Sequence, residues 1–450
     1  MRTLNDLSAA LAVGKTTSRQ LVEDCLARIA DPGGEGARVF IKVDAEGARA
    51  AADAMDTLRR AGRAPGPFAG IPFSVKDLAD IAGQPTPAGS MVLADAPPAA
   101  ANAAVVQRIA DAGFVIMGRT NMTEFAFSGL GINPHYGTPK APWDRATGRI
   151  PGGSSAGAGV SVADGMAYGA LGTDTGGSCR IPAAMVGIVG YKPTARRVPI
   201  TGILPLSTSL DSIGPLANSV ACAAAIDAIF AGEALPDLVA AGLAGLRLGA
   251  PENFFLDGAD AAVVAAYEAA LSKLSAAGAR IERFHMAAID DVLRANARGG
   301  FAIAESWAWH RDLIAARAGG YDPQVLKRIM PGRDMGAGDY VALLAARTDI
   351  CARSNTATRD FDALVMPTCP LLPPPIAALE ADSAEYTRVN MMQLRNCAVG
   401  NFLDRCAISL PCTPRGEPPV GLMLMGQTMG DEKLFRVAAA VEAAIAATWA

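Results

Sequence analysis

The sequence predicts an α/β layered fold, in which helices cover both faces of a sheet, and two observations support this prediction. Short apolar runs typical of buried strands alternate with Ala-rich segments of helical spacing. Apolar residues make up 51% of the 450 residues and charged residues only 19%, so a large core can form and disorder is excluded. The chain has no internal repeat and no low-complexity tail. We therefore expect a single domain over residues 1–450.

Residues 1–65 are predicted to be a helical N-terminal segment. Thr17 and Ser18 provide an N-cap, and apolar residues from Leu21 to Ile29 then recur on one helix face. A second, Ala-rich helix is expected over residues 50–60.

Four apolar runs further along the chain are predicted to be buried strands. They lie at residues 70–75, 114–117, 246–249 and 363–366. Prolines cluster between residues 367 and 375, directly after the last run. A linker is one interpretation of this cluster, but a strand followed by a stiff surface loop fits the sequence on both sides equally well.

Charge and hydropathy exclude several classes of protein. The net charge is −4 and no basic run occurs, so no nucleic-acid partner is expected. The most apolar stretch, residues 220–250, is interrupted by charged residues, so no membrane helix is expected. The N-terminus lacks an apolar signal core. The eight cysteines show no CxxC pair and no disulfide-scaffold density, which is typical of reduced thiols in a cytoplasmic protein.

The chain contains only three histidines, His135, His285 and His310. A mechanism that needs several histidines is therefore disfavoured. No metal-ligand spacing connects them, and we expect neither a metal nor a cofactor.

Two Gly/Ser-rich segments, residues 151–159 and 172–180, are the first candidates for chemistry. Glycine lets a backbone approach a ligand closely, and successive N–H groups in such loops can hold an anion. A serine in the same loop can act as a nucleophile beside its own oxyanion site. The alternative is that each segment is only a flexible connection.

Residues 153–157 also match the nucleophile-elbow pattern G-x-S-x-G, which would make Ser155 the nucleophile, with His285 or His310 as its base. That motif requires a preceding apolar strand, and residues 144–149 are mostly polar. A phosphate-binding loop is weaker still, because no Gly-Lys-Ser/Thr follows.

Lys76 ends the apolar run at residues 71–75. A lysine in such a place is commonly a surface residue whose stem alone is buried. If it is desolvated instead, its pKa falls and the neutral amine can act as a base without any histidine.

Together, Lys76, residues 152–155 and residues 172–180 resemble the amidase signature family. Further segments that fit the same family lie at residues 118–125, 181–184, 190–194, 209–215 and 419–423. The resemblance covers essentially the whole chain and is densest in a signature core at residues 66–220. It implies an α/β/α layered domain around a mixed, twisted sheet of about eleven strands, and an enzyme that hydrolyses carboxylic amides.

The resemblance also implies a Ser–cis-Ser–Lys triad. Ser178 would be the nucleophile, Ser154 would follow a cis Gly153–Ser154 peptide, and Lys76 would lie behind Ser154. Ser155 would support the proton relay, while Asp174 and Arg180 would lock the loop. The oxyanion would be held by the backbone N–H groups of Thr175, Gly176, Gly177 and Ser178.

The resemblance implies that substrate specificity is set by variable segments, here residues 290–345 and 385–410. They contain six candidate pocket residues: Phe301, Trp307, Trp309, Tyr321, Arg328 and Arg395. The aromatic residues, Trp307 among them, either line a pocket for the acyl group or belong to the core. Arg328 or Arg395 either pairs with a substrate carboxylate or is a solvated surface residue.

Three alternatives to a free-standing amidase acting on a small molecule remain. The first is the glutaminase subunit of the tRNA-dependent amidotransferases, but residues 392–395 supply no acid where we expect one for the α-ammonium of glutamine. A non-catalytic binding protein on the same fold would have no chemical need for Lys76 or Ser154. The third is the elbow hydrolase built on Ser155. Homodimers are common among relatives, and the sequence alone identifies no interface.

Overall fold

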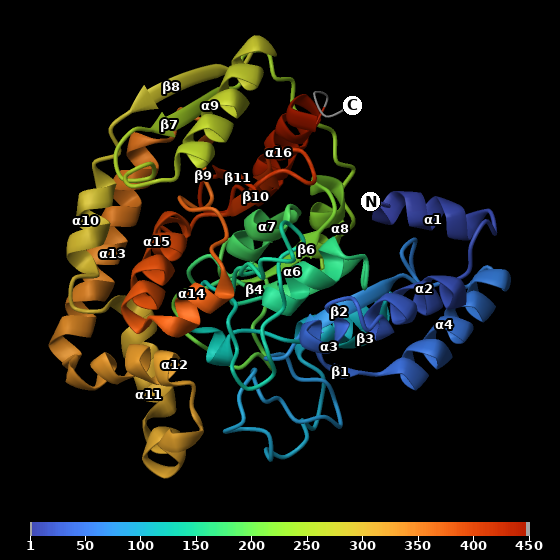
Figure 1. The fold of residues 1–450 in the computed structure, drawn as a ribbon. Helices are drawn as coiled ribbons and strands as arrows, with labels where there is room; N and C mark the ends of the chain where they lie inside the picture. Colours follow the sequence, from blue (N-terminus) through green and yellow to red (C-terminus); the bar gives the residue numbers. More distant parts are fainter. Residues whose placement is uncertain (1, 447–450) are drawn as a thin grey trace.

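The computed structural model describes residues 2–446 (Figure 1). Met1 and residues 447–450, which the predicted domain includes, lie outside the described residues. One mixed sheet of eleven strands runs in the order β1-β3-β2-β4-β6-β5-β10-β11-β9-β7-β8, so the expected layered α/β fold is confirmed. The strands are β1 (Phe40–Val43), β2 (Pro72–Lys76), β3 (Val115–Thr120), β4 (Gly169–Thr173), β5 (Val189–Lys192), β6 (Ile213–Ala217), β7 (Arg247–Pro251), β8 (Arg280–Phe284), β9 (Ala363–Pro367), β10 (Ala407–Pro411) and β11 (Gly421–Met425).

The direction of the strands changes along the sheet. β3, β2 and β4 are parallel neighbours, as are β9, β7 and β8. Between these two groups, every pair from β4 to β9 is antiparallel, and β1 is antiparallel to β3. Parallel neighbours need crossover connections, which explains why helices separate these strands in the sequence.

Around β9 both faces of the sheet are buried, because successive residues of this strand enter two different apolar clusters. In β9, Ala363 and Val365 belong to one cluster, whereas Leu364 and Met366 belong to the other. The first cluster includes side chains of α2 (Ser18–Ala30), α8 (Val220–Ala231), α9 (Ala261–Ala276) and α16 (Asp431–Ala446). The second includes side chains of α10 (Ala288–Ala295), α13 (Ala337–Ala357) and α15 (Ser383–Phe402). A strand covered on both faces has a continuous apolar sequence, which made β9 easy to predict.

The N-terminal segment contains four helices and one short strand. The helices are α1 (Leu4–Ala12), α2, α3 (Gly36–Val39) and α4 (Ala45–Arg60). Thr17 is the N-cap of α2, as predicted, and its side chain accepts a hydrogen bond from the N–H of Gln20. The sequence does not predict β1, because a four-residue edge strand is too short to show a pattern.

The central strands β4, β5 and β6 also escape prediction from sequence, because they contain glycine where strands usually carry branched residues. Gly172 of β4 pairs with Gly214 of β6. A Cβ atom at Gly214 would lie 1.9 Å from the carbonyl oxygen of Tyr191. Glycine here allows close approach of neighbouring backbones and does not end the strand.

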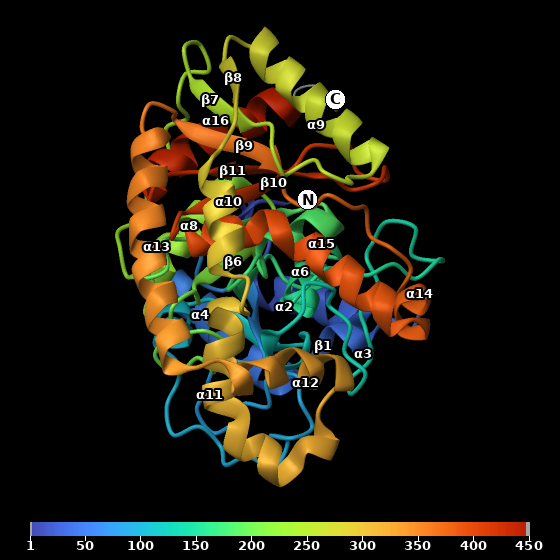
Figure 2. The ribbon, with the colours of Figure 1, turned by 90° about the vertical axis from the view of Figure 1, so that its left-hand side faces the viewer.

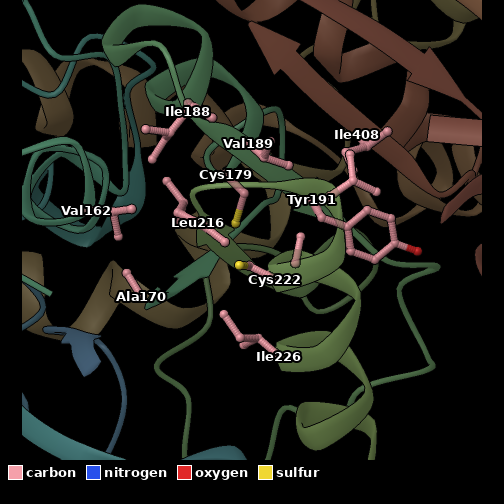
Figure 3. Packing of buried hydrophobic residues seen from close by; sticks show 14 of the residues in the cluster. Val162, Ala170, Cys179, Ile188, Val189, Tyr191, Leu216, Cys222, Ile226 and Ile408 are labelled. Carbon is pink, nitrogen blue, oxygen red and sulfur yellow. The ribbon is translucent and has the colours of Figure 1, made fainter. Parts of the chain in front are cut away.

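Large side chains pack around these glycine-rich strands (Figure 3). Val189 of β5, Leu216 of β6 and Ile226 of α8 belong to the same buried cluster as Cys179. Cys179 directly precedes α7 (Arg180–Val186) and follows Ser178. The core therefore fixes the backbone next to the predicted nucleophile.

The proline cluster after β9 is a loop, but its first half is not a surface loop, so that part of the expectation is wrong. Thr368, Cys369 and Pro370 are buried. The N–H of Thr368 donates to the carbonyl oxygen of Gly421, and its hydroxyl pairs with Ser409 Oγ at 2.7 Å. Polar partners on the neighbouring strands keep this segment inside the fold.

Helices from two separate parts of the chain gather on one side of the molecule (Figure 2). They are α10, α11 (Gly300–Arg317), α12 (Pro323–Ile329), α13 and α15. The remaining helices are α5 (Ala104–Asp111), α6 (Ala156–Ala163) and α14 (Ile376–Ala381), with short 3₁₀ turns at residues 124–126, 318–320 and 330–334.

Candidate active site

Lys76 is the last residue of β2 and lies between β3 and β4. Its side chain is fully buried, and its Nζ donates to Ser154 Oγ at 2.7 Å and to Thr173 Oγ1 at 2.8 Å. Burial disfavours the ammonium and lowers the pKa of Lys76 to about 7. The alternative of a surface lysine is wrong, and the amine is available as a base near neutral pH.

Ser154 lies in the loop before α6, after a cis Gly153–Ser154 peptide bond. The N–H of Gly153 donates to the carbonyl oxygen of Gly129 at 2.8 Å. A Cβ atom at Gly153 would lie 2.5 Å from the backbone nitrogen of Gly131, so only glycine fits here. This close contact holds the Ser154 hydroxyl against Lys76.

Asp174 holds the loop that carries Ser178. Its carboxylate accepts the N–H groups of Gly177 at 2.8 Å and Cys179 at 3.2 Å. It also forms a fully buried, two-point ion pair with Arg180, at 2.8 and 2.9 Å. Burial disfavours the carboxylate, but the charge and hydrogen bonds of Arg180 outweigh it and keep the pKa of Asp174 below its ordinary value.

Asn401, near the C-terminal end of α15, completes this buried network. Its side-chain amide donates to the carboxylate and to the carbonyl oxygen of Asp174, at 2.9 and 3.0 Å, and its oxygen accepts from Arg180 at 2.7 Å. Helix α15 is thus hydrogen-bonded to the loop of Ser178.

The four predicted oxyanion donors differ in their present partners. The N–H of Gly177 already donates to Asp174. The N–H groups of Thr175, Gly176 and Ser178 have no acceptor within residues 2–446. The Ser178 hydroxyl also has no hydrogen-bond partner in that range, and Ser178 lines a cavity. Three N–H groups and the hydroxyl are therefore free to meet a ligand.

Ser155 joins the two Gly/Ser-rich segments through hydrogen bonds. Its N–H donates to the carbonyl oxygen of Ser178 at 3.3 Å, and its hydroxyl donates to the carbonyl oxygen of Thr173 at 3.4 Å. The hydroxyl therefore contacts the backbone of β4. These contacts favour a supporting role for Ser155 over that of a nucleophile.

In the part of the chain that the structure describes, none of the three histidines is hydrogen-bonded to Ser154, Ser155 or Ser178. His310 is buried in α11, where its Nδ1 lies 2.9 Å from the Tyr321 hydroxyl, and burial lowers its pKa to about 4. His135 Nε2 lies 2.9 Å from the carboxylate of Glu124. His285 is exposed just after β8. The elbow hydrolase lacks a base, so this alternative is not supported.

A cavity of about 400 Å³ opens in front of Ser178. Its floor includes Ser178, Thr175 and Gly176, and its walls are mostly apolar side chains of α10, α11 and α15, such as Phe301 and Leu394. This volume is in the range of small-molecule sites. The segments 290–345 and 385–410 both contribute, although they are distant in sequence.

The predicted pocket residues fall into two groups. Arg328 and Arg395 line the cavity. Trp307 does not, because it packs with the apolar cluster around α11 and α12. Trp309 and Tyr321 are likewise absent from the lining, and Tyr321 belongs to the same cluster. A helix presents only one face to a cavity, and the sequence alone does not show which face of α11 that is.

Three polar residues that support the site were not singled out from the sequence: Thr173, Asn401 and Asp211. Asp211 accepts hydrogen bonds from the Thr175 hydroxyl and from the N–H groups of Leu206 and Ser207. Burial raises the pKa of Asp211 to about 6. Thr173 and Asp211 lie in segments that match the family, so this match could have identified them. Asn401 is identifiable only from its contacts.

Within residues 2–446, no group of three or more His, Cys, Asp or Glu side chains is arranged to hold a metal ion. In the same range, no helix is long and apolar enough to cross a membrane.

Comparison with known proteins supports the same assignment. Residues 20–435 match the family model described as Amidase. The chain is 39% identical to 2-amino-5-chloromuconic acid deaminase of Comamonas testosteroni, over 89% of this chain and 87% of the relative. It is 36% identical to one subunit of the glutamyl-tRNA(Gln) amidotransferase of Acidothermus cellulolyticus, over 98% of this chain and 94% of the relative.

Solved structures agree with the sequence relatives. A crystal structure of an amidase superimposes with a TM-score of 0.88 at 32% identity, covering 98% of this chain and 99% of that one. The peptide amidase from Stenotrophomonas maltophilia gives a TM-score of 0.79 at 29% identity, covering 98% and 96%. An inactive binding protein is therefore not supported. The chain belongs to the amidase family and is an enzyme that hydrolyses amide carbon–nitrogen bonds.

Proposed function

We propose that the enzyme hydrolyses a small carboxylic amide through an acyl-enzyme on Ser178, with Ser154 and Lys76 as the proton relay. The observation that carries this proposal is the hydrogen bond of 2.7 Å between Lys76 Nζ and Ser154 Oγ. The lysine is fully buried and no carboxylate among residues 2–446 is hydrogen-bonded to it, so its neutral form is accessible near pH 7.

The first step is attack on the amide. Neutral Lys76 accepts the proton of the Ser154 hydroxyl while Ser154 accepts the proton of Ser178, and Ser178 Oγ bonds to the carbonyl carbon. The resulting oxyanion lies against the N–H groups of Thr175, Gly176 and Ser178, which have no acceptor within residues 2–446. One such donor typically contributes about 3–4 kcal/mol to the transition state. Gly177 is better placed to fix the loop, because its N–H is bonded to Asp174.

The second step breaks the carbon–nitrogen bond. The proton held by Lys76 returns through Ser154 to the departing nitrogen, which leaves as ammonia or an amine. Water then attacks the ester, transfers a proton through the same relay, and releases Ser178 and the carboxylic acid. Asp174, Arg180 and Ser155 take no proton in this scheme and position the two loops.

The amidotransferase relative raises a second candidate, release of ammonia from glutamine for a partner protein. The cavity lining supports it poorly. Residues 2–446 contribute no Asp or Glu to that lining, so the α-ammonium of glutamine would have no ionic partner there. Two arginines are present instead.

The test measures ammonia or amine release from aliphatic, aryl and carboxylate-bearing amides, carbamoyl compounds and glutamine. Ser178→Ala should abolish turnover by the folded protein, while Ser155→Ala should retain most of it. Mass spectrometry of wild-type enzyme quenched during turnover should show the acyl group on the peptide that contains Ser178. Equal rates in wild type and Ser178→Ala, or loss of activity only in Ser155→Ala, would refute the nucleophile assignment. Turnover of glutamine alone would favour the second candidate.

A further inference from the structure

Arg328 and Arg395 line the same cavity as Ser178, and both guanidinium groups are incompletely paired. Neither forms an ion pair with a carboxylate within residues 2–446. The Nε of each is buried and has no hydrogen-bond partner in that range. A partly buried cation whose Nε is buried without a partner is unfavourable, so each guanidinium is poised to accept an anion.

Both side chains are nevertheless held in place. Arg328 lies 4.8 Å from the ring centre of Phe127, and Arg395 lies 5.0 Å from that of Phe254. Arg328 also contacts Met391 Sδ at 3.7 Å, and Arg395 donates to the carbonyl oxygen of Asp257. Ring faces and sulfur atoms support a guanidinium without neutralising it, so the positive charge remains available to a ligand.

The two arginines lie on different helices, but both line the cavity wall at α15. Arg328 comes from α12 and contacts Met391 of α15, while Arg395 lies one turn further along α15. Neither donates a hydrogen bond to the loop at residues 174–178 in the part of the chain that the structure describes. Both guanidinium groups therefore lie in the cavity wall without a hydrogen bond to the loop of Ser178.

The remaining lining is mostly apolar and contains no Asp or Glu among residues 2–446. We propose that the substrate is the monoamide of a dicarboxylic acid, with its free carboxylate bound by Arg328 and Arg395 and its apolar chain along α15. A guanidinium can hold a carboxylate through two parallel hydrogen bonds. This inference rests on the proposed function, which places the amide carbonyl at Ser178.

The reaction balances as hydrolysis. The carbon–nitrogen bond breaks, water supplies the oxygen of the new carboxylate, and ammonia leaves with a proton as ammonium. The product is a dicarboxylate, so a wall of two cations also suits the product, which carries one more negative charge than the substrate.

A binding experiment tests the site without turnover. Glutarate, succinate and adipate are titrated calorimetrically into Ser178→Ala at constant ionic strength, with pentanamide as the neutral comparison. At least one diacid should bind, and pentanamide more weakly. Adding Arg328→Met or Arg395→Met should weaken diacid binding about 10- to 100-fold. Arg333→Met is the matched control, because Arg333 is exposed and outside the lining, and it should change nothing.

A kinetic experiment then tests the substrate class. Wild-type enzyme should prefer glutaramate to pentanamide in kcat/KM, and either arginine variant should lose that preference because kcat/KM falls more for glutaramate than for pentanamide. The proposal fails if no diacid binds Ser178→Ala, or if binding and preference are unchanged in both variants. Turnover by Ser178→Ala would refute the proposed nucleophile, whereas the calorimetric result on the arginines would stand independently.

Discussion

The proposed reaction centre and the pocket wall of this enzyme are built in opposite ways. At the reaction centre, Lys76, Asp174 and Arg180 are fully buried, and each has its hydrogen bonds within the protein. On the pocket wall, Arg328 and Arg395 are half-buried and lack an ionic partner within residues 2–446. The first arrangement fixes atoms for one kind of chemistry, and the second leaves charge available to choose a substrate.

The difference follows from the elements that carry each region. The reaction centre lies on strand ends and on loops whose close contacts only glycine permits. The pocket wall is formed largely by helices α10, α11, α12 and α15, whose apolar side chains pack in two clusters. Side-chain packing tolerates substitution, whereas backbone contacts at the distances found around Gly153 and Gly214 do not.

The largest expected effect is on the reaction centre itself. Lys76→Met should lower kcat about 10²- to 10⁴-fold, because the relay loses its base. Lys192→Met is the matched control. Lys192 is also fully buried, but among the described residues its amine donates only to the carbonyl oxygens of Pro193 and Arg405. Steady-state kinetics on folded protein, checked by circular dichroism, should show kcat nearly unchanged in the control. Equal losses in both variants would contradict the assigned base.

The second prediction compares one substitution in the two regions. Arg180→Met should lower the free energy of unfolding by about 3–5 kcal/mol, because it leaves the buried Asp174 carboxylate without its ion pair. Arg395→Met should change that free energy by less than about 1 kcal/mol. Urea unfolding followed by fluorescence measures both. Similar losses would mean that the wall arginine is structural, and the contrast between the regions would disappear.

The third prediction concerns pH. Protonation of Lys76 removes the base, so kcat/KM should fall about tenfold per unit below pH 7 and level off above it. Asp211 has a pKa raised to about 6 and therefore titrates over the same acidic part of the pH profile. The variant Asp211→Asn distinguishes the two groups. The fall in kcat/KM below pH 7 should persist in that variant. A flat profile from pH 5 to pH 9 in the wild type would show that Lys76 does not titrate as described.

The smallest expected effect is at Trp307, which lies outside the cavity lining. Trp307→Phe should leave the ranking of amide substrates unchanged, with each kcat/KM within about twofold of the wild type. Phe301→Leu, on the same helix but in the lining, should shift the ranking by about tenfold. A changed ranking in Trp307→Phe alone would mean that Trp307 lines the substrate pocket.

The two regions also differ in how far the sequence revealed them. The sequence alone indicated the layered α/β class, four strands of the sheet, the strand end that carries Lys76 and the loops that carry Ser154 and Ser178. It could do so because buried strands are continuous apolar runs, and because the close backbone contacts of these loops demand glycine at fixed positions. The resemblance to the amidase family then supplied roles for these residues, and the cis peptide before Ser154.

Only the tertiary structure decided the rest. It shows that Lys76 is fully buried. The sequence does not reveal this burial, because it depends on β3 and β4, the strands on either side of β2. It brings Asn401 to Asp174 across 227 residues of sequence. It also separates Arg328 and Arg395, which line the cavity, from Trp307, which does not. Burial, long-range partners and the face that a helix presents arise from packing between distant segments, and local sequence does not encode these contacts.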